Sequence, residues 1–92
     1  MILNDRILGQ LEARGWTEQE VLELIKTKPI GSSIDHRTPR KTSDQRARHD
    51  TATVYGSKDG GHVVVNDRTG EVVHISDKND PDWKPDSRII WT

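Results

Sequence analysis

The chain has 92 residues, a length that suits one domain near the lower end of what folds without disulfides or metals. Only 30% of the residues are hydrophobic, and the absence of cysteine excludes a disulfide framework, a thiolate metal site and a thiol nucleophile. The formal charge of -1 argues against a uniformly basic surface for nucleic acid. No apolar run approaches the roughly 18–20 residues that span a bilayer, and polar residues 4–6 interrupt any signal-peptide core. We therefore expect a small soluble domain.

Residues 1–28 predict two helices. In the first, Asn4 is a capping residue, and Gly15 suits the left-handed position that follows a helix C-terminus.

The second helix has the clearer start. Thr17 and Glu20 form a T-x-x-E capping box, and Trp16 and Val21 stand at the positions of a hydrophobic staple. Pro29 marks its end.

Residues 29–50 hold most of the clustered positive charge and read as a long basic loop, with a short strand at residues 33–34 as an option. Five basic residues stand against a single acidic one between positions 36 and 48: Arg37, Arg40, Lys41, Arg46 and Arg48. Such a segment is either a solvated connector or a set of phosphate contacts, since arginine binds two phosphate oxygens at once.

Residues 51–92 predict an antiparallel sheet, because "TATVY", "HVVVN" and "EVVHI" are separated by turn-forming sequences. "SRIIW" is a candidate edge strand. A three-residue hairpin loop with Gly70 in the left-handed region would place Val64 opposite His74 and Asp67 opposite Glu71.

This register predicts two different faces for the hairpin. One carries Val63, Val65, Val73 and Ile75 and should cover the helices; the other is an open floor for a ligand, made of His62, Val64, Asn66, Val72, His74 and Ser76. The expected fold is α+β, with N-terminal helices packed on a small twisted antiparallel sheet.

Site chemistry is not decided by these patterns alone. The four histidines match no zinc spacing, so we expect no metal and no cofactor. Trp83 and Trp91 are expected to be core or sheet-covering aromatics, with base stacking as the less favoured alternative. A basic loop beside a polar sheet face suits an RNA-binding module or a small metal-independent ribonuclease.

The order of several motifs is more specific. "RGWTEQEV", "SSIDHRTPRKT", "ATVYGS", "VVVNDRTGEVVHISDKNDPDW" and "DSRIIW", from Arg14 to Trp91, resemble the C-terminal ribonuclease domain of the colicin E-five family. The resemblance implies a barnase/colicin/RelE-like fold over a single domain, 1–92. It also implies a metal-independent endoribonuclease toxin that cuts tRNA anticodon loops between the wobble queuosine or guanosine and the following uridine.

The same resemblance implies the rest of the biology. The substrates would be the tRNAs for tyrosine, histidine, asparagine and aspartate, and the products a 2′,3′-cyclic phosphate and a 5′-OH. A cognate immunity protein would cover the RNA site. The domain would be exported as part of a larger colicin or contact-dependent inhibition toxin and would act, as a monomer, in the cytoplasm of a target bacterium.

The family motif also implies site residues. Arg37 matches the catalytic arginine, and Asp35 the aspartate that holds it or contacts a base. This chain has His36 where the family has a lysine, and Gly61-His62 where the family has a Lys-Tyr pair. Because the lysine of that pair is missing, substitutes are expected from Lys58, Lys28 and His62. The remaining candidates are expected to bind RNA: Arg40, Lys41, Arg48, Asn66, Asp67, Arg68, Ser76 and Lys78. Two alternatives stay open: a catalytically degenerate RNA-binding relative, and a ribonuclease of the same fold with another RNA target.

Overall fold

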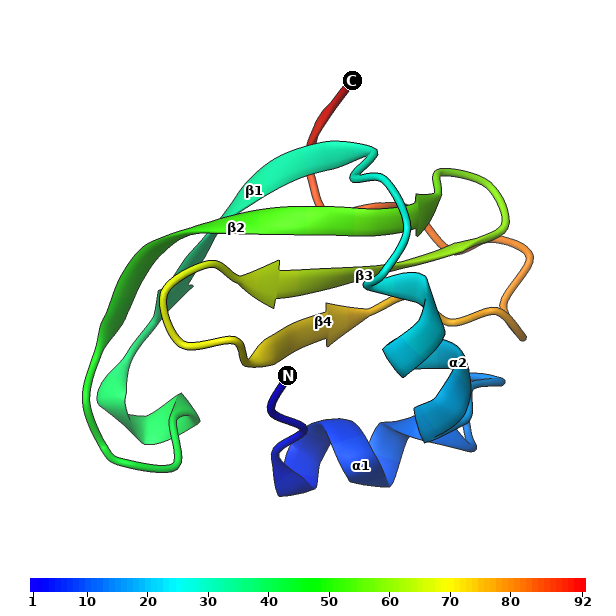
Figure 1. The fold of residues 1–92 in the computed structure, drawn as a ribbon. Coiled ribbons are helices and arrows are strands. Elements are labelled where there is room, and N and C mark those ends of the chain that lie inside the picture. Colours follow the sequence, from blue (N-terminus) through cyan, green and yellow to red (C-terminus); the bar gives the residue numbers. More distant parts are fainter.

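A computed structural model describes all 92 residues as two short helices and one five-stranded antiparallel sheet (Figure 1). The helices are α1 (Asp5–Leu11) and α2 (Glu18–Leu24), and a 3₁₀ turn, η1, covers Pro39–Lys41. The strands are β1 (Gly31–Arg37), β2 (Arg48–Ser57), β3 (Gly61–Asn66), β4 (Val72–Ile75) and β5 (Ile90–Trp91), in the spatial order β4-β3-β2-β1-β5. The expected α+β architecture is confirmed. Neither helix has the length and apolar character needed to cross a membrane.

Local capping defines both helices as the sequence predicts. The Asn4 side chain accepts a hydrogen bond from the Ile7 backbone N–H (2.9 Å) at the start of α1. Gly15 has φ +81°, the left-handed conformation that lets the chain turn back towards α2. At α2, Thr17 and Glu20 make both hydrogen bonds of the capping box.

The helices pack on the β3–β4 half of the sheet and form the larger core. Its buried members come from the two helices, the turn between them and two strands: Ile7, Leu11, Trp16, Val21, Val63, Val72 and Ile75. Trp16 also donates its indole N–H to the Ser76 carbonyl oxygen (2.8 Å), which ties the helical part to the end of β4.

The β3–β4 hairpin has the predicted pairing of Val64 with His74, but its bulge lies elsewhere. The register shifts between Val64 and Val65, so Val65 pairs with Val72 and Val73 becomes the extra residue. Val72 therefore faces the helices, and Val73 packs on the opposite face; our assignment of these two valines was wrong.

The turn of this hairpin is also longer than predicted. The Asn66 side chain accepts hydrogen bonds from the backbone N–H groups of Arg68 and Thr69, and the Asn66 N–H donates to the Glu71 carbonyl oxygen. Glu71 thus lies opposite Asn66 and not opposite Asp67. The side-chain turn explains the difference, because asparagine closes a loop one residue earlier than a three-residue hairpin does.

The opposite sheet face is not an open floor throughout. A second, smaller core of Ala52, Val54, Val64 and Ile89 lies there. The C-terminal segment crosses this face, with Trp83 stacked on His74 and Trp91 edge-on to the buried His62. The sheet-covering role expected for both tryptophans is confirmed, as is the edge strand β5, which pairs with β1.

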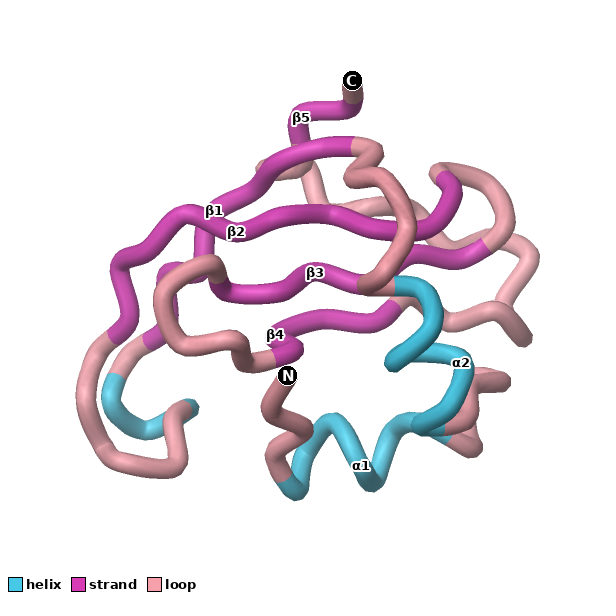
Figure 2. The backbone as a smooth tube through the Cα atoms, in the orientation of Figure 1, coloured by secondary structure: helices cyan, strands magenta, loops and turns pink.

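The predicted basic loop at residues 29–50 is wrong over much of its length. Residues 31–37 form β1 and residues 48–50 begin β2, and the segment that connects these strands curls down to the level of α1 and carries η1 (Figure 2). Burial alternates along β1, yet the buried positions include Ser33, Asp35 and Arg37. An apolar–polar alternation therefore could not reveal this strand.

Candidate functional site

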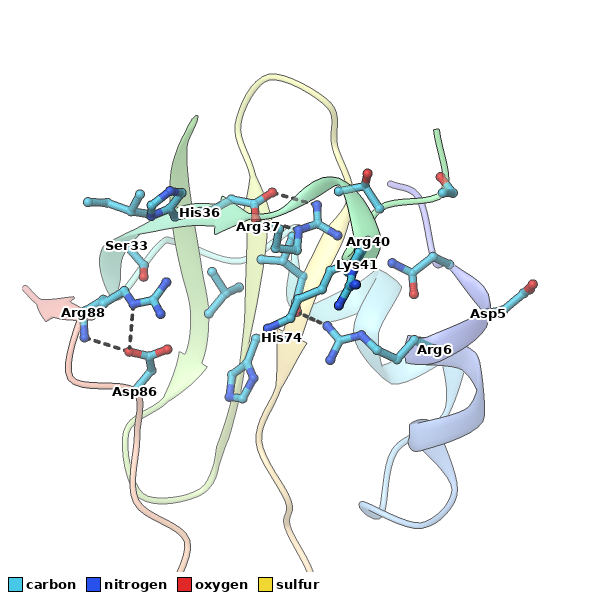
Figure 3. Close-up of a pocket in the computed structure, with 17 residues that line it drawn as sticks. Asp5, Arg6, Ser33, His36, Arg37, Arg40, Lys41, His74, Asp86 and Arg88 are labelled. Atoms are coloured by element: carbon cyan, nitrogen blue, oxygen red, sulfur yellow. Dashed lines mark hydrogen bonds and ion pairs between the residues drawn. The ribbon is translucent and has the colours of Figure 1, made fainter. Parts of the chain in front are cut away.

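The principal cavity lies on the sheet face away from the helices and has a volume of about 590 Å³ (Figure 3). Its floor includes Val64, Val73 and His74. Arg37, Arg40 and Lys41 enter from β1 and η1, Arg6 from α1, and Asp86 and Arg88 from the C-terminal segment on the opposite side. Elements from the whole chain thus converge on one polar, cation-rich hollow.

A buried fork holds Arg37 at this cavity. Its Nε and Nη2 donate to the two carboxylate oxygens of Asp35, each at 2.7 Å. Both residues are on the same face of β1 because they are two positions apart. Burial acts to raise the pKa of Asp35, but hydrogen bonds from Arg37 and Asn66 outweigh it and hold the pKa below its usual range. Asp35 is therefore a carboxylate at neutral pH.

A second ion pair braces the first. Glu71 Oε1 accepts from Arg48 Nε (2.8 Å), and Glu71 Oε2 lies 3.2 Å from Arg37 Nη2. The Arg48 Nη1 also reaches Asp44 Oδ1 at 3.0 Å. Arg48 is thus a buried member of the network, although we predicted it among the residues that contact RNA.

Asn66 links this network to the outer edge of the site. Its side-chain nitrogen donates to Asp35 (2.7 Å) and to Asp50 (3.0 Å). Asp50 in turn accepts a two-pronged hydrogen bond from Arg68, which lowers the pKa of Asp50. Asn66 is buried, and Arg68 is exposed.

The balance of charge makes the cavity attractive to anions. The buried pairs of Arg37 and Arg48 with Asp35 and Glu71 neutralise one another. Neither Arg40 nor Lys41 forms an ion pair.

One nitrogen of Arg37, a residue that lines the cavity, is also left without a hydrogen-bond partner. This nitrogen, Nη1, is buried. An unpartnered guanidinium nitrogen, on a residue that lines the same cavity as two unpaired cations, is an arrangement suited to phosphate oxygens.

His74 lies at the cavity floor as a neutral imidazole. Burial lowers its pKa to about 4, with the positive charges of His62 and Arg14 acting in the same direction. Its ring centroid is 6.1 Å from that of His62. Nowhere do three or more His, Asp or Glu side chains gather in an arrangement that could hold a metal ion.

The structure separates the predicted site residues into groups. Asp35, Arg37, Arg40 and Lys41 line the principal cavity. A second cavity of about 370 Å³ brings together four others, Lys58, His62, Ser76 and Lys78. In it, Lys78 lies over the Trp16 ring and pairs with Glu20, so this lysine is already engaged.

Five predicted residues line neither cavity. Three of them, Arg48, Asn66 and Arg68, belong to the network described above. Asp67 accepts hydrogen bonds from Thr51 and Thr53 on the other face of β2. Lys28 is exposed after α2 and lines neither hollow.

Sequence reasoning missed four residues of the principal site: Arg6, Glu71, Asp86 and Arg88. Arg6 donates to the Val73 carbonyl oxygen (2.9 Å), and Arg88 Nε lies 3.9 Å from Asp86. None of them stands near the basic segment in sequence, so no local spacing marks them.

Comparison with known proteins gives the same family throughout. The family model "Colicin E5 ribonuclease domain" matches residues 3–88. The chain is 57% identical over 91 residues, 99% of its length, to the tRNA nuclease CdiA of Burkholderia pseudomallei. It is 52% identical over 90 residues, 97% of its length, to Colicin-E5 of Escherichia coli. It spans only 7% and 49% of those two relatives. These matches show that the chain belongs to the colicin E5 ribonuclease domain family.

Proposed function

We propose that this chain is a metal-independent endoribonuclease that cuts tRNA in the anticodon loop. The observation that carries the proposal is one cavity lined by Arg37, whose Nη1 has no hydrogen-bond partner, and by Arg40 and Lys41, which form no ion pair. One relative's name, tRNA nuclease, and the family's description as a ribonuclease domain support it.

Cleavage in this cavity would need no group beyond the protein and the RNA. The ribose 2′-oxygen loses its proton and bonds to the neighbouring phosphorus, and the bond from phosphorus to the 5′-oxygen breaks as that oxygen gains a proton. Negative charge builds on the phosphate oxygens at the midpoint. Arg37, Arg40 and Lys41 would stabilise that charge, and the products would be a 2′,3′-cyclic phosphate and a 5′-OH.

Asp35 would serve by holding Arg37 and not by taking the proton. Its two oxygens already accept hydrogen bonds, and its pKa is lowered, so it is a weak base. The second cavity, with Lys58 and His62, would contact nucleotides that flank the cut.

Further parts of the proposal concern which tRNAs are cut, the protein that inhibits the cut, and where the domain acts. The cut would fall between the wobble queuosine or guanosine and the following uridine in the tRNAs for tyrosine, histidine, asparagine and aspartate. A cognate immunity protein would cover the cavity. The domain would travel as the toxic part of a larger exported protein and act in the cytoplasm of a target bacterium. The short span of the chain within its relatives supports that arrangement.

Incubation of the purified domain with total bacterial tRNA in EDTA tests the activity. We expect the four queuosine tRNAs to be cut once, with cyclic-phosphate ends, and two unrelated tRNAs to stay intact. Sequencing of the 5′-OH ends would reveal a different target. Tight tRNA binding without any product would identify a non-catalytic relative and refute the proposal.

Arg37→Lys tests the assignment of Arg37. Alanine is unsuitable, because removing one partner of a buried ion pair costs about 3–5 kcal/mol and leaves Asp35 unpaired. Lysine keeps the charge but loses the planar fork, so kcat should fall by about 10²–10³-fold, as when one oxyanion donor is lost. Arg46→Lys is the matched control, since Arg46 is exposed in the same hairpin. Full activity of a folded Arg37→Lys enzyme would remove Arg37 from the mechanism.

A further inference from the structure

We propose that Glu71 is a positioning residue, which fixes the orientation of the Arg37 guanidinium so that Nη1 faces the scissile phosphate. This inference rests on the proposed ribonuclease function. It concerns a side chain to which the sequence motifs assign no role, immediately before the hairpin strand β4 and 34 positions from Arg37 along the chain.

The hydrogen-bond inventory of Arg37 shows what Glu71 adds. A guanidinium has five N–H groups, one on Nε and two on each terminal nitrogen. Asp35 takes the Nε–H and one N–H of Nη2, both at 2.7 Å. Glu71 Oε2 lies 3.2 Å from Nη2 and forms an ion pair with it. Only Nη1 is left without a partner.

Two carboxylates from different parts of the chain fix the plane of the Arg37 guanidinium better than one does. Asp35 belongs to the same strand as Arg37, so a fork to Asp35 alone lets the guanidinium tilt together with its own side chain. Glu71 approaches from across the sheet and blocks that tilt. A misplacement of about 1 Å in such a group can reduce a rate about 10²-fold.

Glu71 is itself held in place. Its Oε1 accepts from Arg48 Nε at 2.8 Å, its backbone oxygen accepts from the Asn66 N–H at 2.8 Å, and its backbone N–H donates to Thr69 Oγ1 at 3.2 Å. Only 4% of the residue is exposed to solvent. Each carboxylate oxygen therefore serves one arginine, and Glu71 connects the hairpin turn rigidly to β1 and β2.

The ion-pair network can orient the Arg37 guanidinium, but it adds no net charge to the site. Arg37, Arg48, Asp35 and Glu71 together carry no net charge, so the group as a whole does not attract phosphate. Stability alone also gives little reason to bury four charges, because apolar side chains of similar volume often stabilise a fold as well or better. What the ion-pair network provides is one fixed direction for the free nitrogen of Arg37.

Glu71→Gln tests the proposal with almost no change in shape. The amide keeps one oxygen but turns an NH₂ towards the other arginine, so one of the two guanidinium contacts is lost. We expect kcat on tRNA to fall about 10–100-fold with KM changed less than about 3-fold. Glu12→Gln is the matched control, because Glu12 is exposed and its side chain forms no hydrogen bond or ion pair.

Epistasis separates positioning from a general weakening of the fold. If Glu71 acts through Arg37, Glu71→Gln should cause little further loss of kcat in the Arg37→Lys background. An equal loss in both backgrounds, or a folded Glu71→Gln enzyme with the kcat of the parent protein, would overturn the proposal.

An NMR measurement without substrate makes the result independent of activity. In the parent protein, the Arg37 guanidinium N–H signals should be resolved, because rotation at Nη2 is hindered; in Glu71→Gln they should broaden or average. Unchanged signals would refute the hold on Arg37, whereas a parent protein that cuts no RNA would refute only the proposed function. If Glu71→Gln does not fold, Glu71→Asp takes its place, since it keeps the charge and shortens the reach. A folded Glu71→Asp with full kcat and unchanged signals would count equally against the proposal.

Discussion

Acidification should weaken this fold through His74, well before most carboxylates titrate. The ring is stacked on Trp83 at a centroid distance of 5.6 Å, and burial is the main reason that its pKa falls from 6.5 to about 4. The unfolded chain therefore binds this proton more readily than the folded one. The stabilising effect of a neutral His74 is complete above about pH 6.5 and is lost progressively as the pH falls towards 4. One pKa unit corresponds to about 1.4 kcal/mol, so the full effect is about 3.5 kcal/mol. That is a large share of the roughly 5–15 kcal/mol that stabilises a typical small domain.

Urea unfolding at pH 7.5 and pH 4.5 measures this contribution, with His74→Phe as the comparison. Phenylalanine keeps an aromatic ring against Trp83 but cannot bind a proton. The free energy of unfolding of the parent protein should drop by about 2.5 kcal/mol more than that of His74→Phe between the two pH values. Changes at the carboxylates occur in both proteins and cancel in the difference. Equal drops in the two proteins would show that His74 is not held neutral by its burial.

Two further changes act on the backbone. Gly9 lies in α1 with nothing near the position of an added Cβ, so Gly9→Ala should raise the free energy of unfolding by about 0.4–1 kcal/mol. Gly56→Ala should lower the free energy of unfolding by more than about 1 kcal/mol, because Gly56 has φ +116° and the Cβ would overlap the Gly61 carbonyl oxygen. Thermal melts of the two variants decide this, and similar melting temperatures would contradict it. Thr17→Ala removes one half of the α2 capping box and should lower stability by about 1 kcal/mol in urea titrations; no loss would mean that the contact with Glu20 is replaced by water.

The sequence predicted the helix starts and one pairing of the β3–β4 hairpin, but not the length of its turn or the place of its bulge. A capping box needs only Thr17 and Glu20, three residues apart, and a left-handed turn position needs only Gly70. The pairing of Val64 with His74 followed from the same short-range rules. The family motif likewise placed Asp35 and Arg37 together, and alternation along a strand brings them to one face.

Other features depend on residues that are far apart in the sequence, so only the tertiary structure reveals them. β1 buries Asp35 and Arg37, and these charges are satisfied inside the protein only with Glu71 and Asn66, which come from another hairpin. The bulge that turns Val73 away from the helices depends on how the Asn66 side chain closes the turn.

The sequence by itself determined the helix caps, the turn residues and the family motif that carries the candidate arginine. Only the tertiary structure determined that Arg48 forms a buried ion pair with Glu71, that Arg6 and Arg88 line the same cavity, and that Lys28 lies outside that cavity. The physical reason is the range of the interactions. Caps and turns are satisfied within a few residues, whereas a buried charge is satisfied only by partners that the whole fold brings to it.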